Sequence, residues 1–211
     1  MPNTAAFPSE HTLNSSVPLL SDYISSSPKN IYSPLPLGDT EIRLVTIVPG
    51  ILEDPMVCIL EAVSLDSPLA YEALSYVWGN LDDSRTIIVN NAPADVTSNL
   101  DMALRYIRHP EELRTMWIDA ICIDQSNTVE RNQQVRMMTS IYRRAHTVLI
   151  WVGILEEQET FSVLERINRR DAGQINHCGI LATLILRDWF HRIWTKQELT
   201  VALRDPWIIF G

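Results

Sequence analysis

Residues 115–125 constrain the fold of this chain more than any other segment. They read Thr-Met-Trp-Ile-Asp-Ala-Ile-Cys-Ile-Asp-Gln, a run of large apolar residues that leads into two acids and an amide. Residues 116–118 are typical of a strand buried on both faces, as in a parallel sheet covered by helices. The carboxyl ends of such strands line the crevice where open α/β sheets bind ligands. We therefore expect Asp119, Asp124 and Gln125 at a functional site, with a turn-capping Asp119 and solvated acids as the open alternative.

Strand and helix patterns alternate along most of the chain. Residues 41–48 and 56–64 flank Pro49-Gly50 and predict a hairpin-like pair. Further strands are expected at residues 71–78, 86–89, 115–119, 147–151 and 206–210. Helices are expected from Ser98 to Pro110, beyond an Asn127 N-cap, and near residues 157–168, 178–187 and 188–203. The alternation predicts a mainly parallel α/β sheet flanked by helices, with an extra N-terminal hairpin-like pair.

Apolar spacing predicts which helix faces and aromatic residues are buried. The first helix should bury Leu100, Ala103, Leu104 and Ile107, and the second should bury Val135, Met138, Ile141, Tyr142 and Ala145. Trp117, Trp151 and Tyr142 are expected in the core, the commoner location of large aromatic residues on such elements.

The first 38 residues differ in composition from the rest. They contain half of the 12 prolines and two short serine runs. Such a segment buries too little apolar surface to order itself, so residues 1–38 are predicted to be a mostly disordered leader. Residues 39–211 form the expected domain.

Charge and motif searches exclude several classes of protein. The net charge of −9 argues against a nucleic-acid binder. Neither a phosphate-binding glycine loop nor a metal-ligand spacing of histidines or cysteines is present. The three scattered cysteines indicate a reducing compartment. With no signal peptide and no apolar run of membrane-spanning length, we expect a cytoplasmic protein with no membrane contact.

Two residues offer catalytic chemistry. Cys122 follows a strand and could act as a nucleophile if His146 or His191 approached it, but a small buried cysteine is the commoner reading. Glu198 lies four residues after Trp194, so both occupy one face of a helix. One carboxylate beside an aromatic platform suits cleavage of a glycosidic bond on a cationic nicotinamide ring, because the leaving group departs neutral. The open alternative is a surface ion pair of Glu198 with Arg192 or Lys196.

Together these segments resemble the fungal heterokaryon-incompatibility (HET) domain. The resemblance covers residues 35–211 and is carried by several motifs in order. These are Tyr-Glu-Ala-Leu-Ser-Tyr-Val-Trp-Gly at 71–79, Trp-Ile-Asp-Ala-Ile-Cys-Ile-Asp-Gln at 117–125, Glu130-Arg131 with the apolar positions that follow, and Trp189-Phe190, Arg192, Trp194 and Gln197-Glu198. It implies a role in non-self recognition and programmed cell death.

HET domains are in turn remotely similar to TIR domains, which have a flavodoxin-like sheet and cleave NAD in some members. By that resemblance Glu198 is the catalytic carboxylate. The nucleotide pocket would be lined by Ser75, Tyr76, Trp78, Gly79, Asp119, Gln125 and Trp194. NAD is then a substrate, and no resident cofactor or metal is expected. The competing class is a non-catalytic signalling module that acts by homotypic association, so self-association or a signalling partner is expected in either case.

Overall fold

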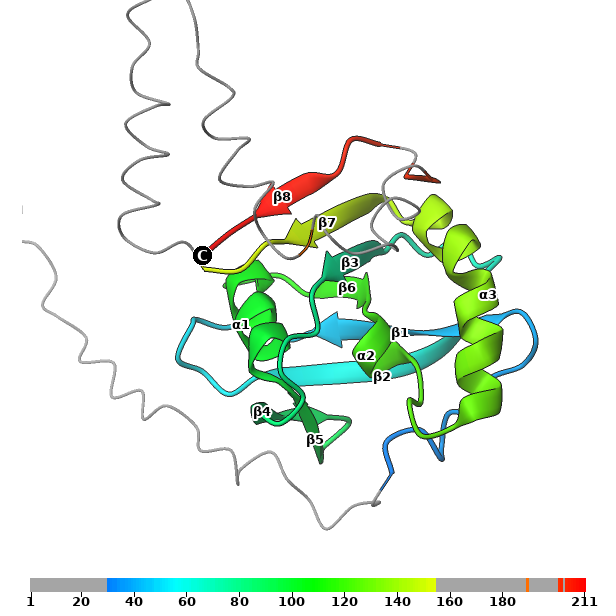
Figure 1. The fold of residues 1–211 in the computed structure, drawn as a ribbon, viewed down its shortest axis with the longest axis horizontal. Helices are drawn as coiled ribbons and strands as arrows, with labels where there is room; N and C mark the ends of the chain where they lie inside the picture. Colours follow the sequence, from blue (N-terminus) through cyan, green and yellow to red (C-terminus); the bar gives the residue numbers. More distant parts are fainter. Residues whose placement is uncertain (1–29, 155–188, 190–200, 203) are drawn as a thin grey trace, which may run out of the picture.

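The computed structural model of the chain describes residues 30–154, 189, 201, 202 and 204–211 (Figure 1). These residues form one eight-stranded sheet with three helices packed on it. The strands are β1 (Glu41–Ile47), β2 (Val57–Ser64), β3 (Glu72–Tyr76), β4 (Ser84–Val89), β5 (Ala92–Thr97), β6 (Arg114–Trp117), β7 (Thr147–Trp151) and β8 (Trp207–Ile209). The helices are α1 (Ser98–Ile107), α2 (Asp119–Cys122) and α3 (Thr128–Arg144).

The sheet is mixed, with strand order β5-β4-β2-β1-β6-β3-β7-β8 (Figure 1). Strands β6, β3, β7 and β8 run parallel to one another, and β2 is parallel to β4. The pairs β1–β2, β1–β6 and β4–β5 are antiparallel. The predicted α/β class is confirmed. The predicted parallel arrangement is found only in the half of the sheet from β6 to β8.

The strand order in this parallel half reverses between β3 and β7. Taken by chain position, β6-β3-β7-β8 is the order 2-1-3-4, so successive connections leave β3 in opposite directions. Ligands of open α/β sheets bind at such a switch point, outside the carboxyl ends of the strands. The topology therefore marks the loops after β3, β6 and β7 as the place to look for a site.

Helices α1 and α3 cover opposite faces of this parallel half. Trp117 is in register with Ala73 of β3, whereas Trp151 is in register with Tyr76. These two positions of β3 are three residues apart and so point to opposite faces. A tyrosine of α1 packs on Trp151, and a tyrosine of α3 packs edge-on against Trp117. Both faces are covered, as a doubly wound sheet requires.

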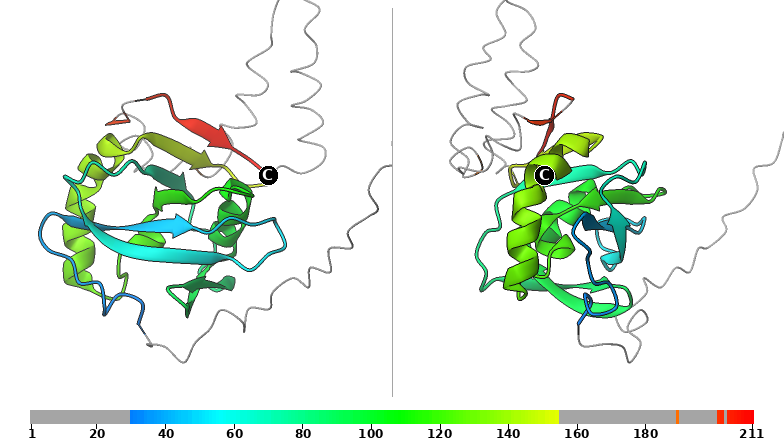
Figure 2. Two further views of the ribbon diagram at one scale, coloured as in Figure 1. Left: turned by 180° about the vertical axis from the view of Figure 1, so that it is seen from behind. Right: turned by 90° about the vertical axis from the view of Figure 1, so that its right-hand side faces the viewer.

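The predicted N-terminal pair forms, but in an unexpected place. β1 and β2 pair in antiparallel fashion along their full length, as the reverse view shows (Figure 2). Instead of extending one end of the sheet, β1 also pairs with β6 and lies inside it. Because both of its edges and faces are covered, β1 does not keep the alternation its sequence suggests. Arg43 is only 1% exposed and Val45 is fully buried.

The predicted aromatic core is confirmed. Trp117, Trp151 and Tyr142 are 0%, 1% and 2% exposed. Met116 and Ile118, which flank Trp117, are also fully buried. The predicted apolar face of α1 is buried throughout. Burial of one such large side chain contributes roughly 1.5–3 kcal/mol, so each of these residues adds substantially to the stability of the domain.

One strand was not predicted. The turn Asn90-Asn91 connects β4 to β5, and both residues have positive φ, 51° and 62°. Two such residues are typical of the two-residue hairpin turn whose twist matches that of the strands. Proline and aspartate are uncommon in strands, but Pro93 is tolerated because β5 is the last strand at its end of the described sheet.

Helix ends agree closely with their sequence signals. The side chain of Asn127 accepts hydrogen bonds from the backbone N–H groups of Val129 and Glu130, so the predicted N-cap of α3 is confirmed. At α1 the prediction that Ser98 caps the helix, in a capping-box-like pair with Asp101, is wrong. The capping side chain is Thr97, which accepts from the N–H of Leu100, and Ser98 is the first helical residue. The predicted burial of Val135 in α3 is wrong, because this residue is 42% exposed.

The helices expected after residue 154 fall almost entirely outside the described residues. Within the part of the chain that the structure describes, no helix is long and apolar enough to span a membrane. The predicted terminal strand is confirmed as β8.

Candidate functional site

The loops that follow β3 and β6 meet at the carboxyl edge of the sheet. The indole Nε1 of Trp78, two residues after β3, donates a 2.9 Å hydrogen bond to Oδ2 of Asp119, two residues after β6. Both side chains are half-buried. A charge-assisted hydrogen bond of this kind fixes the orientation of both groups. Two residues that the sequence predicted for the site, 41 positions apart, are thus brought into contact.

Helix α2 and the loop after it complete the surroundings of Asp119. Oδ1 of Asp119 accepts from the backbone N–H of Ala120 at 2.7 Å. The side-chain amide of Gln125 donates to the carbonyl oxygen of Asp119 at 2.9 Å. The chain here was predicted as a loop and instead makes one helical turn. That turn carries Gln125 back toward Trp78 and Asp119.

A cavity of about 220 Å³ opens between these residues and α3. Its lining combines an apolar wall with three polar side chains. The lining residues are Trp78, Asp119, Ile123, Gln125, Arg131, Val135 and Met138. We call it the α3 cavity. It contains three of the predicted site residues, and α3 supplies three more residues that were not predicted as site residues.

Those three α3 residues had a signal in the sequence. Arg131, Val135 and Met138 are spaced i, i+4 and i+7, which places them along one helix face. The same spacing predicted Val135 and Met138 as core. Val135 borders the cavity instead of a packed interior, which explains its exposure.

A second cavity, of about 200 Å³, lies at the switch point between β3 and β7. Its lining residues are Val77, Gly79, Asn99, Trp151, Val152, Gly153 and Trp189. We call it the switch-point cavity. Gly79 and Gly153 both have positive φ, 79° and 93°, a conformation that favours glycine. The predicted site residue Gly79 thus borders this cavity, and Trp78 borders its neighbour.

Asn99 joins the two strands that flank the switch point. Its amide nitrogen donates to the carbonyl oxygen of Val77 at 2.5 Å, and its amide oxygen accepts from the indole nitrogen of Trp151 at 3.0 Å. A Cβ atom added to Gly79 would lie 3.3 Å from the Cβ of Asn99. The first turn of α1 therefore packs closely against the loop after β3.

Ser75 and Tyr76 occupy the interior and do not line either cavity. They are 1% and 2% exposed. Oγ of Ser75 accepts a 2.7 Å hydrogen bond from the indole of Trp189, which ties β3 to the last of the family motifs named from the sequence. Their predicted role in nucleotide binding stays a prediction. In the structure both residues are buried in β3, directly before the loop that carries Trp78 and Gly79.

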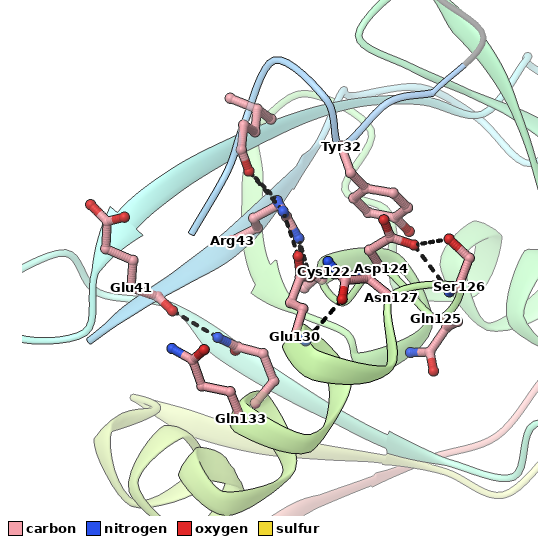
Figure 3. Close-up of polar contacts among 12 residues, drawn as sticks. Tyr32, Glu41, Arg43, Cys122, Asp124, Gln125, Ser126, Asn127, Glu130 and Gln133 are labelled. Atoms are coloured by element: carbon pink, nitrogen blue, oxygen red, sulfur yellow. Dashed lines mark hydrogen bonds and ion pairs between the residues drawn. The ribbon is translucent and has the colours of Figure 1, made fainter. Parts of the chain in front are cut away.

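A buried ion pair anchors the loop between α2 and α3 (Figure 3). The guanidinium of Arg43 contacts both carboxylate oxygens of Glu130 at 2.6 and 3.1 Å, and Oε1 of Glu130 also accepts from the backbone N–H of Asp124 at 2.8 Å. Tyr32 lies over the guanidinium at 4.9 Å. Asp124 itself accepts two hydrogen bonds from Ser126. Asp124 thus shapes the loop and does not border the α3 cavity.

The structure argues against Cys122 as a nucleophile. The residue is 1% exposed, and its Sγ accepts from the backbone N–H of Ile118. Burial raises the pKa of its thiol to about 12, so the reactive thiolate is strongly disfavoured at neutral pH. Among the described residues, no group of three or more His, Cys, Asp or Glu side chains could hold a metal ion.

The predicted catalytic Glu198 and its neighbour Trp194 lie outside the described residues. So do the alternative partners Arg192, Lys196 and His191. Within the described residues, the candidate site therefore consists of the α3 cavity and the switch-point cavity, on either side of the loop after β3.

Fold and site together define an α/β protein whose candidate site lies at the carboxyl edge of a doubly wound parallel half-sheet. A sequence profile of the heterokaryon incompatibility protein (HET) family matches residues 71–198, more than half of the chain, and the chain belongs to this family. The resemblance to HET domains is thereby confirmed. The matched segment begins at Tyr71, just before β3, and ends at Glu198.

A curated relative is similar over most of this chain. It is the heterokaryon incompatibility protein 6, OR allele, of Neurospora crassa, with 29% identity over 238 aligned residues. The alignment covers 86% of this chain and 35% of the relative, so the chain spans about a third of the length of the curated relative it matches. No solved structure matches the chain.

Proposed function

We propose that this chain is a cytoplasmic effector domain of fungal non-self recognition that cleaves NAD at the nicotinamide–ribose bond when it is assembled. The observation that supports this best is the α3 cavity. It gathers Trp78, Asp119 and Gln125 at the carboxyl edge of parallel strands, where doubly wound sheets bind nucleotides. The HET family name supports the role in heterokaryon incompatibility, and a cell-death outcome is part of the proposal.

A TIR-like arrangement is part of this proposal. The order 2-1-3-4 of the parallel half is that of flavodoxin-like sheets up to the fourth strand. On this reading β3 is the first strand of the TIR-like unit, and β1, β2, β4 and β5 are additions that widen the sheet. The mostly disordered leader over residues 1–38 and the domain over residues 39–211 stay predictions. Of the described leader residues, Tyr32 and Leu35 contact Arg43 of β1.

The proposed reaction needs one carboxylate. The bond from the ribose C1′ to the nicotinamide nitrogen breaks, and its electron pair leaves with the ring, which becomes neutral. Positive charge develops on the ribose, and the carboxylate of Glu198 would stabilise it. Water then adds to C1′ and gives up a proton to solvent. The products are nicotinamide and ADP-ribose.

The test compares nicotinamide release by the wild-type chain and by Glu198→Gln. Both are assayed at high concentration and on a support that clusters the chains. Glu112→Gln removes an exposed carboxylate before β6 and is the matched control. Release that is lost in Glu198→Gln and kept in Glu112→Gln would support the proposal. Turnover that survives in Glu198→Gln, or is absent from the wild type under clustering, would contradict it.

A specific observation favours the second candidate, a non-catalytic module that signals by homotypic association. Ser75 and Tyr76 belong to the first family motif and are buried, which is the behaviour of core residues. If such a module acts by association alone, Glu198→Gln would leave cell death intact in a fungal host. Loss of cell death in a folded Glu198→Gln chain would argue against it.

A further inference from the structure

Arg43 and Arg131 each border a described cavity, but their guanidinium groups differ in how far they are already hydrogen-bonded. Arg43 lines a cavity near Tyr32, but all five of its N–H groups are engaged, by Glu130 and by the carbonyls of Leu35 and Cys122. Arg131 lines the α3 cavity, is exposed, and makes a 3.3 Å hydrogen bond to the carbonyl of Gln125. No described carboxylate pairs with it.

The overall charge of the chain makes the positive charge of Arg131 significant for the binding of anions. At −9, the protein as a whole repels anions, so an anionic ligand needs a local positive group. Among the described residues, no lysine or arginine borders the switch-point cavity or the open cavity near Asp95 and Asp124. The α3 cavity combines a guanidinium with an aromatic side chain and a carboxylate.

The size of the α3 cavity limits what can enter it. Its volume of about 220 Å³ is below the roughly 300–1,000 Å³ that encloses a whole drug-sized ligand. A single flat ring can lie against Trp78 and Met138, while the remainder of a larger ligand must stay outside. A phosphate attached through a sugar to that ring would then lie within reach of an exposed arginine at the rim.

We infer that the α3 cavity holds the heterocycle of a phosphorylated nucleotide and that Arg131 binds its phosphate. Guanidinium groups match phosphate oxygens in a two-point geometry, and such charge-assisted hydrogen bonds are stronger than neutral ones. Asp119, also in the lining, favours a ring with positive charge. The inference rests on the proposed function and assigns the nicotinamide mononucleotide half of NAD to this cavity.

Two ligands that differ only in the phosphate test the inference. Nicotinamide mononucleotide and nicotinamide riboside are titrated into the chain of residues 1–211, and dissociation constants come from calorimetry. The indole N–H signal of Trp78, identified with Trp78→Phe, reports by NMR whether the ring enters the cavity. Arg131→Gln is compared with Arg136→Gln, which removes an exposed arginine on the same helix outside the cavity lining.

Arg131→Gln should weaken mononucleotide binding about tenfold or more and leave riboside binding unchanged, because one charge-assisted contact is lost. Arg136→Gln should bind like the wild type, and the mononucleotide should shift the Trp78 signal. Equal mononucleotide affinity in Arg131→Gln and wild type, an unmoved Trp78 signal, or no mononucleotide binding would overturn the inference.

The outcomes separate this inference from the catalytic proposal. If mononucleotide binding depends on Arg131 but no NAD is turned over, the inference is supported and the catalytic proposal is contradicted. Turnover that depends on Glu198 but not on Arg131 supports the catalytic proposal and overturns the inference.

Discussion

Arg43 of β1 and Glu130 of α3 form a two-point ion pair in the interior, with N–O distances of 2.6 and 3.1 Å. The arginine side chain is 1% exposed and the glutamate 11%. The pair joins a strand from the hairpin to the helix that borders the α3 cavity, and Glu130 also holds the backbone of Asp124. Breaking it would therefore loosen the loop that carries Gln125.

Glu130→Gln should lower the free energy of unfolding by about 3–5 kcal/mol, because it leaves the buried charge of Arg43 without a counter-charge. Urea denaturation measures the loss. Arg85→Gln is the control, since it breaks the exposed pair with Asp83 and should cost at most about 1 kcal/mol. A Glu130→Gln protein within 1 kcal/mol of wild type would show that the pair contributes little to stability.

Trp117→Ala should destabilise the domain by about 3–5 kcal/mol, because it removes a fully buried aromatic that packs edge-on against Tyr142. Thermal and urea melts test this. Trp207→Ala, at a position 65% exposed, should change stability far less. Equal melting of the two variants would refute the packing role. Loss of function in Trp117→Ala would report unfolding and carry no information on catalysis.

Asn99→Ala should cost roughly 1–3 kcal/mol, since it leaves the buried indole N–H of Trp151 and the carbonyl of Val77 without their partner. The matched control is Asn132→Ala, which replaces an exposed asparagine on α3. The signals of Val77 and Gly79 in an NMR spectrum should shift only in Asn99→Ala. Unchanged signals there would mean that Asn99 does not position the loop after β3.

Stability should fall as pH rises from about 9 toward 12. Burial raises the pKa of the Cys58 and Cys122 thiols from 9.0 to about 12, and it raises the pKa of Tyr32 and Tyr71 as well. In this window the unfolded chain loses protons that the folded chain retains, so the free energy of unfolding decreases with pH.

Urea midpoints at pH 8, 9, 10 and 11 measure that slope. Cys122→Ala removes one of the contributing groups and should give a shallower decline than wild type. A midpoint that stays constant up to pH 11 would contradict the assigned burial of these groups.

Local sequence signals determined much of the fold. The apolar run at residues 116–118, the Asn127 cap and the stripe of α1 predicted a strand, a helix start and a buried face correctly, because each depends on neighbours within a few positions. The two-residue turn Asn90-Asn91 is also a local signal, but the strand that follows it, which contains Pro93 and Asp95, was not predicted. The contact between Trp78 and Asp119 was not predicted, although the rule that the carboxyl ends of parallel strands meet at one edge of a sheet accounts for it.

Only the tertiary structure decided the rest. The insertion of β1 beside β6 depends on pairing between segments about 70 residues apart, and no local pattern specifies that choice. Arg43 is buried by Tyr32, by the carbonyls of Leu35 and Cys122 and by Glu130, contacts that no local pattern specifies. Helical spacing placed Arg131, Val135 and Met138 on one face, but whether that face meets a core or a cavity depends on what lies opposite it. Sequence by itself therefore determined most of the described elements, with β5 and α2 as exceptions, and pointed to the carboxyl edge of the sheet as the candidate site. Long-range packing decided which side chains meet there.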